Sequence, residues 1–183
     1  MNVGQRPTSE LELELTFLPR SVPSQLGSRT ATRVVDYYFP ADPAIHPRLR
    51  IRAADDTYSL TKKMPVEGAD SSAHLESTIP LTTLEFDDLT RSWSRIVEKD
   101  RFAITIDGYP CEVDVFRGSL SGLILLDFEF ESEVAKNAFQ VPTICLADVT
   151  NEPAIAGGKL AGLSYSDIAA TLAHYGYHSL KEG

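Results

Sequence analysis

Three glutamates stand at every second position of a short segment near the start of the chain. Glu10, Glu12 and Glu14 share one strand face with Thr16, because successive side chains of a β-strand point to opposite faces. The leucines between them form the other face. Like charges that oppose each other on neighbouring strands cost about 0.2–1 kcal/mol per pair. Solvent, basic neighbours or a cation must therefore compensate this row.

Later segments repeat the alternation with charged rows of both signs. The further acidic rows are Glu112 with Asp114, and Asp127 with Glu129 and Glu131. The basic rows are Arg48, Arg50 and Arg52; Lys63 beside Ser59 and Thr61; and Lys99 with Arg101. One such strand is typical of a wet surface, whereas several of them, spread over most of the chain, favour a shared charged space.

Composition excludes several classes of protein. The 183 residues are 43% hydrophobic, which suits one domain with a sizeable core. The net charge of −9 argues against a nucleic-acid-binding surface, which needs clustered exposed cations. Cys111 and Cys145 are expected to be reduced thiols. We find neither a signal peptide nor a membrane-spanning run, so we expect a cytoplasmic protein without membrane contact.

Alternating segments and turn residues predict a mainly antiparallel β protein. Asp55-Asp56, Asp107-Gly108 and the stretch 118–122 supply hairpin turns. Helical turns are predicted at 19–27, 82–89, 132–137 and 153–163, and a final capped helix ends at Gly176. The predicted strands are 9–18, 31–39, 48–54, 57–64, 73–80, 94–99, 101–107, 110–117 and 122–131.

Three architectures can accommodate strands that have one apolar face and one charged face. A flat sheet would pack helices on its apolar face, a transmembrane barrel would turn that face to lipid, and a small soluble barrel would turn charge inward. The transmembrane barrel conflicts with the missing export signal and the inserted amphipathic helices. The large Phe128 and Phe130, which alternate with Asp127 and Glu129, need burial and favour the inward-charged barrel.

In this order the segments resemble the CYTH family, also called triphosphate tunnel metalloenzymes. The family includes thiamine triphosphatases, inorganic triphosphatases and class IV adenylate cyclases. Its first strand, Glu-x-Glu-x-Lys, is matched by the two glutamates of 12–16, and its Arg-x-Arg strand by 50–52. The remaining motifs match at Thr61 to Pro65, Glu76, Lys99 to Arg101, Glu112 to Phe116 and Gly122 to Glu129. The similarity runs from about Glu10 to Leu163.

The resemblance implies an α+β fold, a closed antiparallel barrel of eight or nine strands with a few peripheral helices. It also implies a single domain over 1–183, with a core at about 10–163 and a C-terminal helix at 164–176. The tunnel would hold a linear triphosphate with Mg²⁺ or Mn²⁺, hard cations that carboxylates and phosphate oxygens bind. A homodimer is a further possibility that the sequence leaves open.

Residue roles follow from the matched motifs. Arginines would grip the phosphate oxygens with paired hydrogen bonds, and carboxylates would hold metal ions that orient the attacking water. The expected substrate-binding residues are Arg50, Arg52, Lys63, Lys99 and Arg101. The expected metal ligands are Glu12, Glu14, Asp127 and Glu129, of which Glu12, Glu14 and Glu129 are also assigned the catalytic role. Glu76, Glu112 and Asp114 are expected supporting residues.

Two departures from the family pattern qualify the expected activity. Thr16 replaces the lysine of the first motif, which in the family is associated with positioning or activating the attacking water. The C-terminal Ser-Asn-x-x-Leu motif loses its asparagine, and Lys159 is considered as a replacement cation. The leading functional hypothesis is metal-dependent hydrolysis of a triphosphate. The alternatives are triphosphate or polyphosphate binding without turnover, a class IV adenylate cyclase, and a purely structural sheet.

Overall fold

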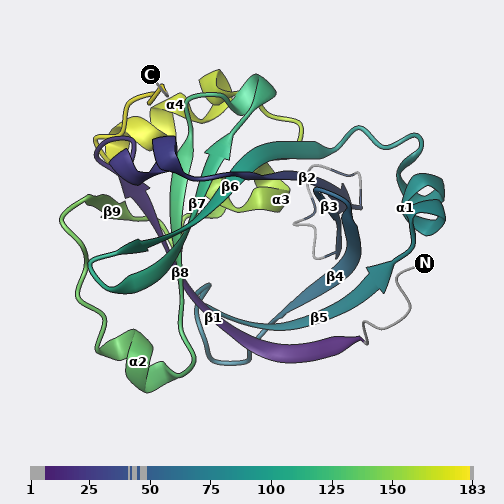
Figure 1. Ribbon diagram of the computed structural model, residues 1–183, viewed down its shortest axis with the longest axis horizontal. Coiled ribbons are helices and arrows are strands. Elements are labelled where there is room, and N and C mark those ends of the chain that lie inside the picture. Colours follow the sequence, from purple (N-terminus) through teal and green to yellow (C-terminus); the bar gives the residue numbers. More distant parts are fainter. Residues whose placement is uncertain (1–6, 41, 43–44, 46–48, 182–183) are drawn as a thin grey trace.

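The computed structural model describes residues 7–40, 42, 45 and 49–181, and its strands form a closed antiparallel barrel (Figure 1). Around the barrel the order is β5-β4-β3-β2-β6-β7-β8-β1, and β1 returns to β5. A ninth strand, β9, extends the sheet beyond β1. The strands are β1 (Thr8–Pro19), β2 (Thr32–Phe39), β3 (Leu49–Ala54), β4 (Thr57–Pro65), β5 (Ala73–Leu81), β6 (Ile96–Ile106), β7 (Tyr109–Phe116), β8 (Ile124–Glu129) and β9 (Cys145–Asp148).

Strand β1 closes the barrel because it changes partner along its length. Its first half pairs with β5, and Glu14 to Phe17 pair with β8. The next residues pair with β9, across a register shift between Leu18 and Pro19. The segment with the alternating glutamates therefore joins the two ends of the sheet.

The hairpin turns form where the sequence predicts them. Asp107 and Gly108, between β6 and β7, have φ values of 49° and 89°, the left-handed geometry of a tight two-residue turn. Asp55, between β3 and β4, has φ 46°. Helix α1 (Thr83–Thr90) begins at Thr82, whose side chain and that of Glu85 form the predicted capping box.

Several predicted boundaries are wrong. The two strands expected at 94–99 and 101–107 are one strand, β6, because Lys99 to Arg101 pair with β2 on one side and with β7 on the other and so join the two halves. The helix expected at 153–163 is a 3₁₀ turn, η3 (Pro153–Ile155), and a short helix, α3 (Gly157–Leu160), broken at Ala156 with φ −57° and ψ 129°. The turn expected at 19–27 is η1 (Ser24–Ser28), and β9 was not predicted.

Apolar packing forms two buried clusters, one on the outside of the barrel and one that also reaches its interior. One buried cluster, which includes Phe102, Val113 and Phe128, covers the outer face of β6, β7 and β8. The other packs Leu18 and Leu125 against Leu160 of α3 and Leu172 of α4 (Tyr165–His174). Helix α2 (Glu133–Asn137) and the 3₁₀ turn η2 (Gly118–Leu120) complete the described elements. Among the described residues, no helix has both the length and the apolar character needed to cross a membrane.

The C-terminal segment is fixed to the barrel at Gly122, directly before β8. The carbonyl of Gly122 accepts hydrogen bonds from the Tyr177 hydroxyl at 2.9 Å and the Leu180 amide at 3.0 Å. Gly122 has φ 106°, and a Cβ at this position would collide with the side chain of Ser179. Only glycine therefore permits this contact.

We predict that Gly122→Ala lowers the free energy of unfolding more than Gly68→Ala does. Gly68 also has a positive φ, 79°, but no atom lies within 4 Å of its Cβ position. The control therefore carries the cost of the backbone conformation alone, about 1–2 kcal/mol, and Gly122→Ala adds about 1–3 kcal/mol for the steric clash. Urea unfolding measures both variants, and equal losses would contradict the packing described.

Candidate functional site

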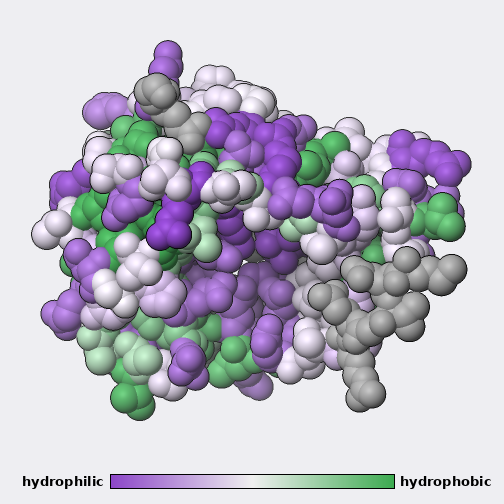
Figure 2. All heavy atoms as spheres, in the orientation of Figure 1, coloured by the Kyte–Doolittle hydropathy of each residue, from purple (hydrophilic) through white to green (hydrophobic). Residues whose placement is uncertain are grey.

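The inward faces of the strands enclose a cavity of about 460 Å³. Figure 2 shows hydrophilic residues gathered around a hollow at the centre of this face. Apolar residues such as Phe116, Val149 and Ile155 form part of the wall. The predicted site residues that line the cavity are Glu14, Arg50, Arg52, Lys63, Lys99, Arg101, Asp114 and Asp127. The charged rows predicted from alternation thus face one enclosed space.

The basic side of the cavity is organised by two buried aspartates. Asp114 of β7 is 1% exposed, and its carboxylate accepts hydrogen bonds from Arg101 Nε and Nη2, both at 2.7 Å, and from Lys99. Asp36 of β2 is fully buried and accepts from Arg52 Nε at 2.7 Å and Nη2 at 2.8 Å. In both cases the partners are directly opposed in the strand register, Asp36 with Arg52 and Asp114 with Arg101.

Sequence reasoning missed Asp36. It stands alone between valines and tyrosines, so it belongs to no charged row. The one available signal was its position on the same face as Val34 and Tyr38 of a predicted strand, where a carboxylate must be either exposed or paired.

Arg50 differs from its neighbours because it makes no hydrogen bond with any described residue. Its Nε is buried without a hydrogen-bond partner, and its closest charged groups are Asp36, 3.8 Å from Nε, and Glu76, 4.0 Å from Nη2. A buried N–H without an acceptor costs about 1–3 kcal/mol. Arg50 therefore offers unused donors to an anion in the cavity.

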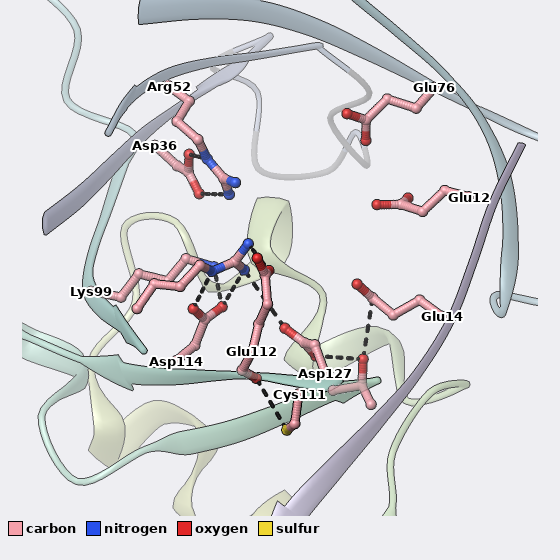
Figure 3. A network of polar contacts seen from close by, with 12 residues as sticks. Glu12, Glu14, Asp36, Arg52, Glu76, Lys99, Cys111, Glu112, Asp114 and Asp127 are labelled. Atoms are coloured by element: carbon pink, nitrogen blue, oxygen red, sulfur yellow. Dashed lines mark hydrogen bonds and ion pairs between the residues drawn. The ribbon is translucent and has the colours of Figure 1, made fainter. Parts of the chain in front are cut away.

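The acidic side lies opposite, on β1, β5 and β8. Figure 3 shows Glu12, Glu14 and Glu76 pointing into the space that Arg52 and Lys99 face from the other side. Glu14 directly opposes Glu129 across the β1–β8 pair. Lys63 forms ion pairs with Glu12 and, at 3.3 Å, with Glu76.

Thr16 occupies the end of the glutamate row and contacts two carboxylates. Its Oγ1 is 2.9 Å from Asp127 Oδ1, to which it donates a hydrogen bond, and 3.3 Å from Glu14 Oε1. The Thr16 amide donates to Thr150 Oγ1 at 3.0 Å. A neutral hydroxyl therefore stands where the family pattern has an ammonium group, so the carboxylates around it lack one positive charge.

Burial and the crowding of carboxylates raise the pKa values of Asp127 and Glu129. The pKa of Asp127 is well above its usual range because burial and the nearby Glu14 and Asp114 charges disfavour ionisation. Burial and the charges of Glu112, Glu14 and Glu12 likewise raise the pKa of Glu129, against the opposing effect of Arg101. Both shifts indicate negative charge that the described cations do not fully neutralise.

The acidic side fits a divalent metal ion. Glu12, Glu14 and Glu129 each place a carboxylate oxygen within 4.8 Å of the others. Oxygen donors of this kind suit Mg²⁺ or Mn²⁺, and a cation would relieve the repulsion between Glu14 and Glu129. Asp127, the fourth predicted ligand, is not part of this cluster of three and pairs instead with Thr16 and, at 3.7 Å, with Arg101.

The other predicted residues lie as follows. Glu12, Glu76, Glu112 and Glu129 are not part of the cavity lining. Glu76 forms an ion pair with Lys63, and Glu112 forms one with Arg101. His74 also lines the cavity. Lys159 lines a separate surface depression beside Arg95, so it does not replace the missing lysine, and Arg48 lies outside the described residues.

Comparison with known proteins identifies relatives along most of the chain. No family model matches it. An inorganic triphosphatase of Nitrosomonas europaea is 34% identical over 146 residues, 77% of this chain and 90% of that protein. A crystal structure of an inorganic triphosphatase has a TM-score of 0.59 and 31% identity, covering 82% of this chain and 97% of the other.

The fold extends to a more distant protein. A Bacillus halodurans protein proposed to be an adenylate cyclase has a TM-score of 0.52 and 18% identity, over 74% of this chain and 94% of that chain. At this identity the likeness concerns the fold alone.

We predict that Asp114→Asn lowers the free energy of unfolding by about 3–5 kcal/mol at pH 7, because Lys99 and Arg101 lose a buried partner. Burial disfavours ionisation of Asp114, but Lys99 and Arg101 outweigh it and hold its pKa well below the usual 3.8. Its stabilising effect is therefore complete above pH 3.8 and is lost as the pH falls below that value.

The difference in free energy of unfolding between Asp114→Asn and the wild type should therefore decrease as the pH is lowered. Urea unfolding at a series of pH values measures it. Asp88→Asn, which removes an exposed ion pair with Arg91, is the control and should change stability by less than about 1 kcal/mol. A pH-independent difference would contradict the lowered pKa.

Proposed function

The chain belongs to the CYTH family of triphosphate tunnel metalloenzymes, and on that premise we propose that its cavity hydrolyses a linear triphosphate. Inorganic triphosphate is the first candidate substrate, because the relative of 34% identity is an inorganic triphosphatase. The observation that carries the proposal is the guanidinium Nε of Arg50, which has no hydrogen-bond partner among the described residues, at a cavity whose opposite wall includes Glu14 of the carboxylate cluster. Such a space suits a polyanion together with a metal cation.

We assign substrate binding to the basic side. Arg50 and Arg52 present N–H groups to the cavity and match phosphate oxygens by paired hydrogen bonds. Lys63, Lys99 and Arg101 add positive charge around the same space. Because the phosphate groups of a triphosphate carry negative charge that increases as the terminal group leaves, these fixed cations stabilise the transition state.

We assign metal binding and catalysis to Glu12, Glu14 and Glu129, with Asp127 as a further ligand. A bound Mg²⁺ or Mn²⁺ would neutralise phosphate charge and lower the pKa of a coordinated water. The carboxylates themselves hold the reacting water on the acidic side, opposite the arginines. Attack of that water in line with the terminal P–O bond forms one phosphorus–oxygen bond and breaks another, the water gives up a proton to a carboxylate and then to solvent, and the products are phosphate and diphosphate.

Several expectations stay predictions. They are the choice between Mg²⁺ and Mn²⁺, the single-domain organisation, a homodimer, the absence of nucleic-acid and membrane partners, and a cytoplasmic location. Of the alternatives to hydrolysis, binding without turnover has a specific observation in its favour, the hydroxyl of Thr16 beside Glu14 and Asp127. The cyclase alternative has no comparable support.

The direct test is an assay of the purified protein with tripolyphosphate, thiamine triphosphate and ATP, each with Mg²⁺ and with Mn²⁺. We expect metal-dependent release of phosphate from at least one of the three. Formation of cyclic AMP would favour the cyclase, and tight tripolyphosphate binding by calorimetry without turnover would favour the binding module. Absence of both binding and release would refute the proposal.

We predict that Glu129→Gln raises the metal concentration needed for half-maximal activity by about tenfold or more, because the cluster loses one charged ligand. Glu10→Gln is the matched control, since Glu10 is an exposed strand glutamate like Glu129 but lies outside the cluster. Metal titrations of phosphate release compare the two variants, and an unchanged metal requirement in Glu129→Gln would remove it from the ligand set.

We predict that Thr16→Lys increases turnover, because the ammonium group would restore the positive charge of the family motif beside Glu14 and Asp127. The measurement is kcat for the preferred triphosphate at saturating metal. Thr16→Met, similar in length and uncharged, separates charge from bulk. A rate that stays at the wild-type value in Thr16→Lys would show that the lysine is not what limits this enzyme.

A further inference from the structure

Asp36 lies at the centre of the basic side and takes no part in the assignments made so far. Its side chain is fully buried on β2, between β3 and β6. Two N–H groups of Arg52 grip its two oxygens, and Arg50 Nε is 3.8 Å from Oδ1. Figure 3 shows Asp36 and Arg52 together at the wall, with the guanidinium group toward the open space.

We propose that Asp36 is a positioning residue that fixes Arg52 for binding of the triphosphate chain. The inference rests on the proposed function, since it concerns the same cavity. Asp36 itself does not line the cavity, because it lies behind the guanidinium groups, so it would not touch the substrate. It acts through Arg52.

The hydrogen bonds of Arg52 show how the positioning works. A guanidinium group has five N–H donors in one plane, and Asp36 uses the Nε donor and one Nη2 donor. No other hydrogen bond joins Arg52 to a described residue, so three donors remain for phosphate oxygens. Because a forked carboxylate pair fixes the plane of the group, the remaining donors have one orientation before substrate arrives.

Charge explains why a carboxylate is required there. Arg50 and Arg52 are two positions apart on the same face of β3, and like charges at such separation repel. Burial disfavours ionisation of Asp36, yet the charges of Arg52 and Arg50 and the Arg52 hydrogen bonds hold its pKa well below the usual range. Asp36 is therefore an anion at neutral pH and holds the two cations together.

Asp36 could also affect phosphate binding in the opposite direction. Asp36 is an anion that already occupies one edge of Arg52, so it could weaken phosphate binding by competing for that cation. Removing the charge without changing the shape separates the two effects. Positioning predicts weaker binding in Asp36→Asn, and competition predicts tighter binding.

The experiment is calorimetric titration of Asp36→Asn with tripolyphosphate in metal-free buffer. We expect the Kd to rise by about tenfold or more, while Mn²⁺ binding in the absence of triphosphate stays at its wild-type value. The matched control is Asp100→Asn, because Asp100 accepts from Arg117 Nε at 2.7 Å in a similar pair on the opposite face of β6. The control should bind tripolyphosphate as the wild type does.

Asp36→Asn leaves buried cations without a partner and could prevent folding. A second variant keeps the inference testable in that case. Asp36→Asn with Arg52→Gln removes both charges of the pair, which restores balance. If Asp36 acts through Arg52, this double variant and Arg52→Gln alone should have the same tripolyphosphate Kd within about twofold. A large difference, or binding by Asp36→Asn that equals or exceeds wild type, would overturn the inference.

The two proposals fail in different ways. Binding in metal-free buffer does not depend on turnover, so a wild-type protein that binds but does not hydrolyse triphosphate would refute the proposed function and leave Asp36 testable. A wild-type protein that hydrolyses triphosphate, with unaltered binding in Asp36→Asn, would refute the positioning role alone.

Discussion

Charge enclosed by a barrel must be balanced within the barrel, because groups that face inward exchange few contacts with solvent. One apolar cluster covers the outer face of β6, β7 and β8 against η1. The other packs against α3 and α4 and contributes Tyr38, Phe116 and Leu125 to the cavity wall, so the charged rows occupy the remaining inward positions of the strands. Asp36 and Asp114 neutralise part of the basic side. Glu14 and Glu129 oppose each other without a cation between them, and Arg50 keeps an unused donor.

These two imbalances have opposite sign and lie across one cavity. A polyanion satisfies the arginine side, and a divalent cation satisfies the carboxylate side. The polyanion and the metal cation also compensate each other's charge, so neither ligand alone neutralises the charge of the cavity. The same electrostatic requirement therefore connects the fold, the composition of the walls and a metal-assisted reaction of a triphosphate.

The barrel was predictable because alternation is a local property. The row of Glu10, Glu12 and Glu14, and the turn at Asp107 and Gly108, each specify their geometry within a few residues. Strand β9 was not predictable in the same way, since its four residues carry no alternating pattern and pair with the end of β1 through tertiary contact. The broken helix at Ala156 likewise reflects packing, with Gly157 directly against the Tyr38 hydroxyl.

Residues that line the cavity were predictable where charges came in rows, as with Arg50 and Arg52. The partner that holds these arginines was not, because Asp36 is an isolated carboxylate whose role depends on the register between β2 and β3. Lys159, considered as a replacement cation but favoured as a surface residue, lies on the short α3 and lines another depression. Strand register decided the position of Asp36, and the local helix decided that of Lys159.

A crystal structure of the protein with tripolyphosphate and Mn²⁺ tests the central claim most directly. The account predicts phosphate oxygens within hydrogen-bond distance of Arg50 and Arg52, with Mn²⁺ between the phosphate chain and the carboxylates of Glu12, Glu14 and Glu129. Ligands bound outside the barrel, or a triphosphate in the cavity with no metal at these glutamates, would contradict it.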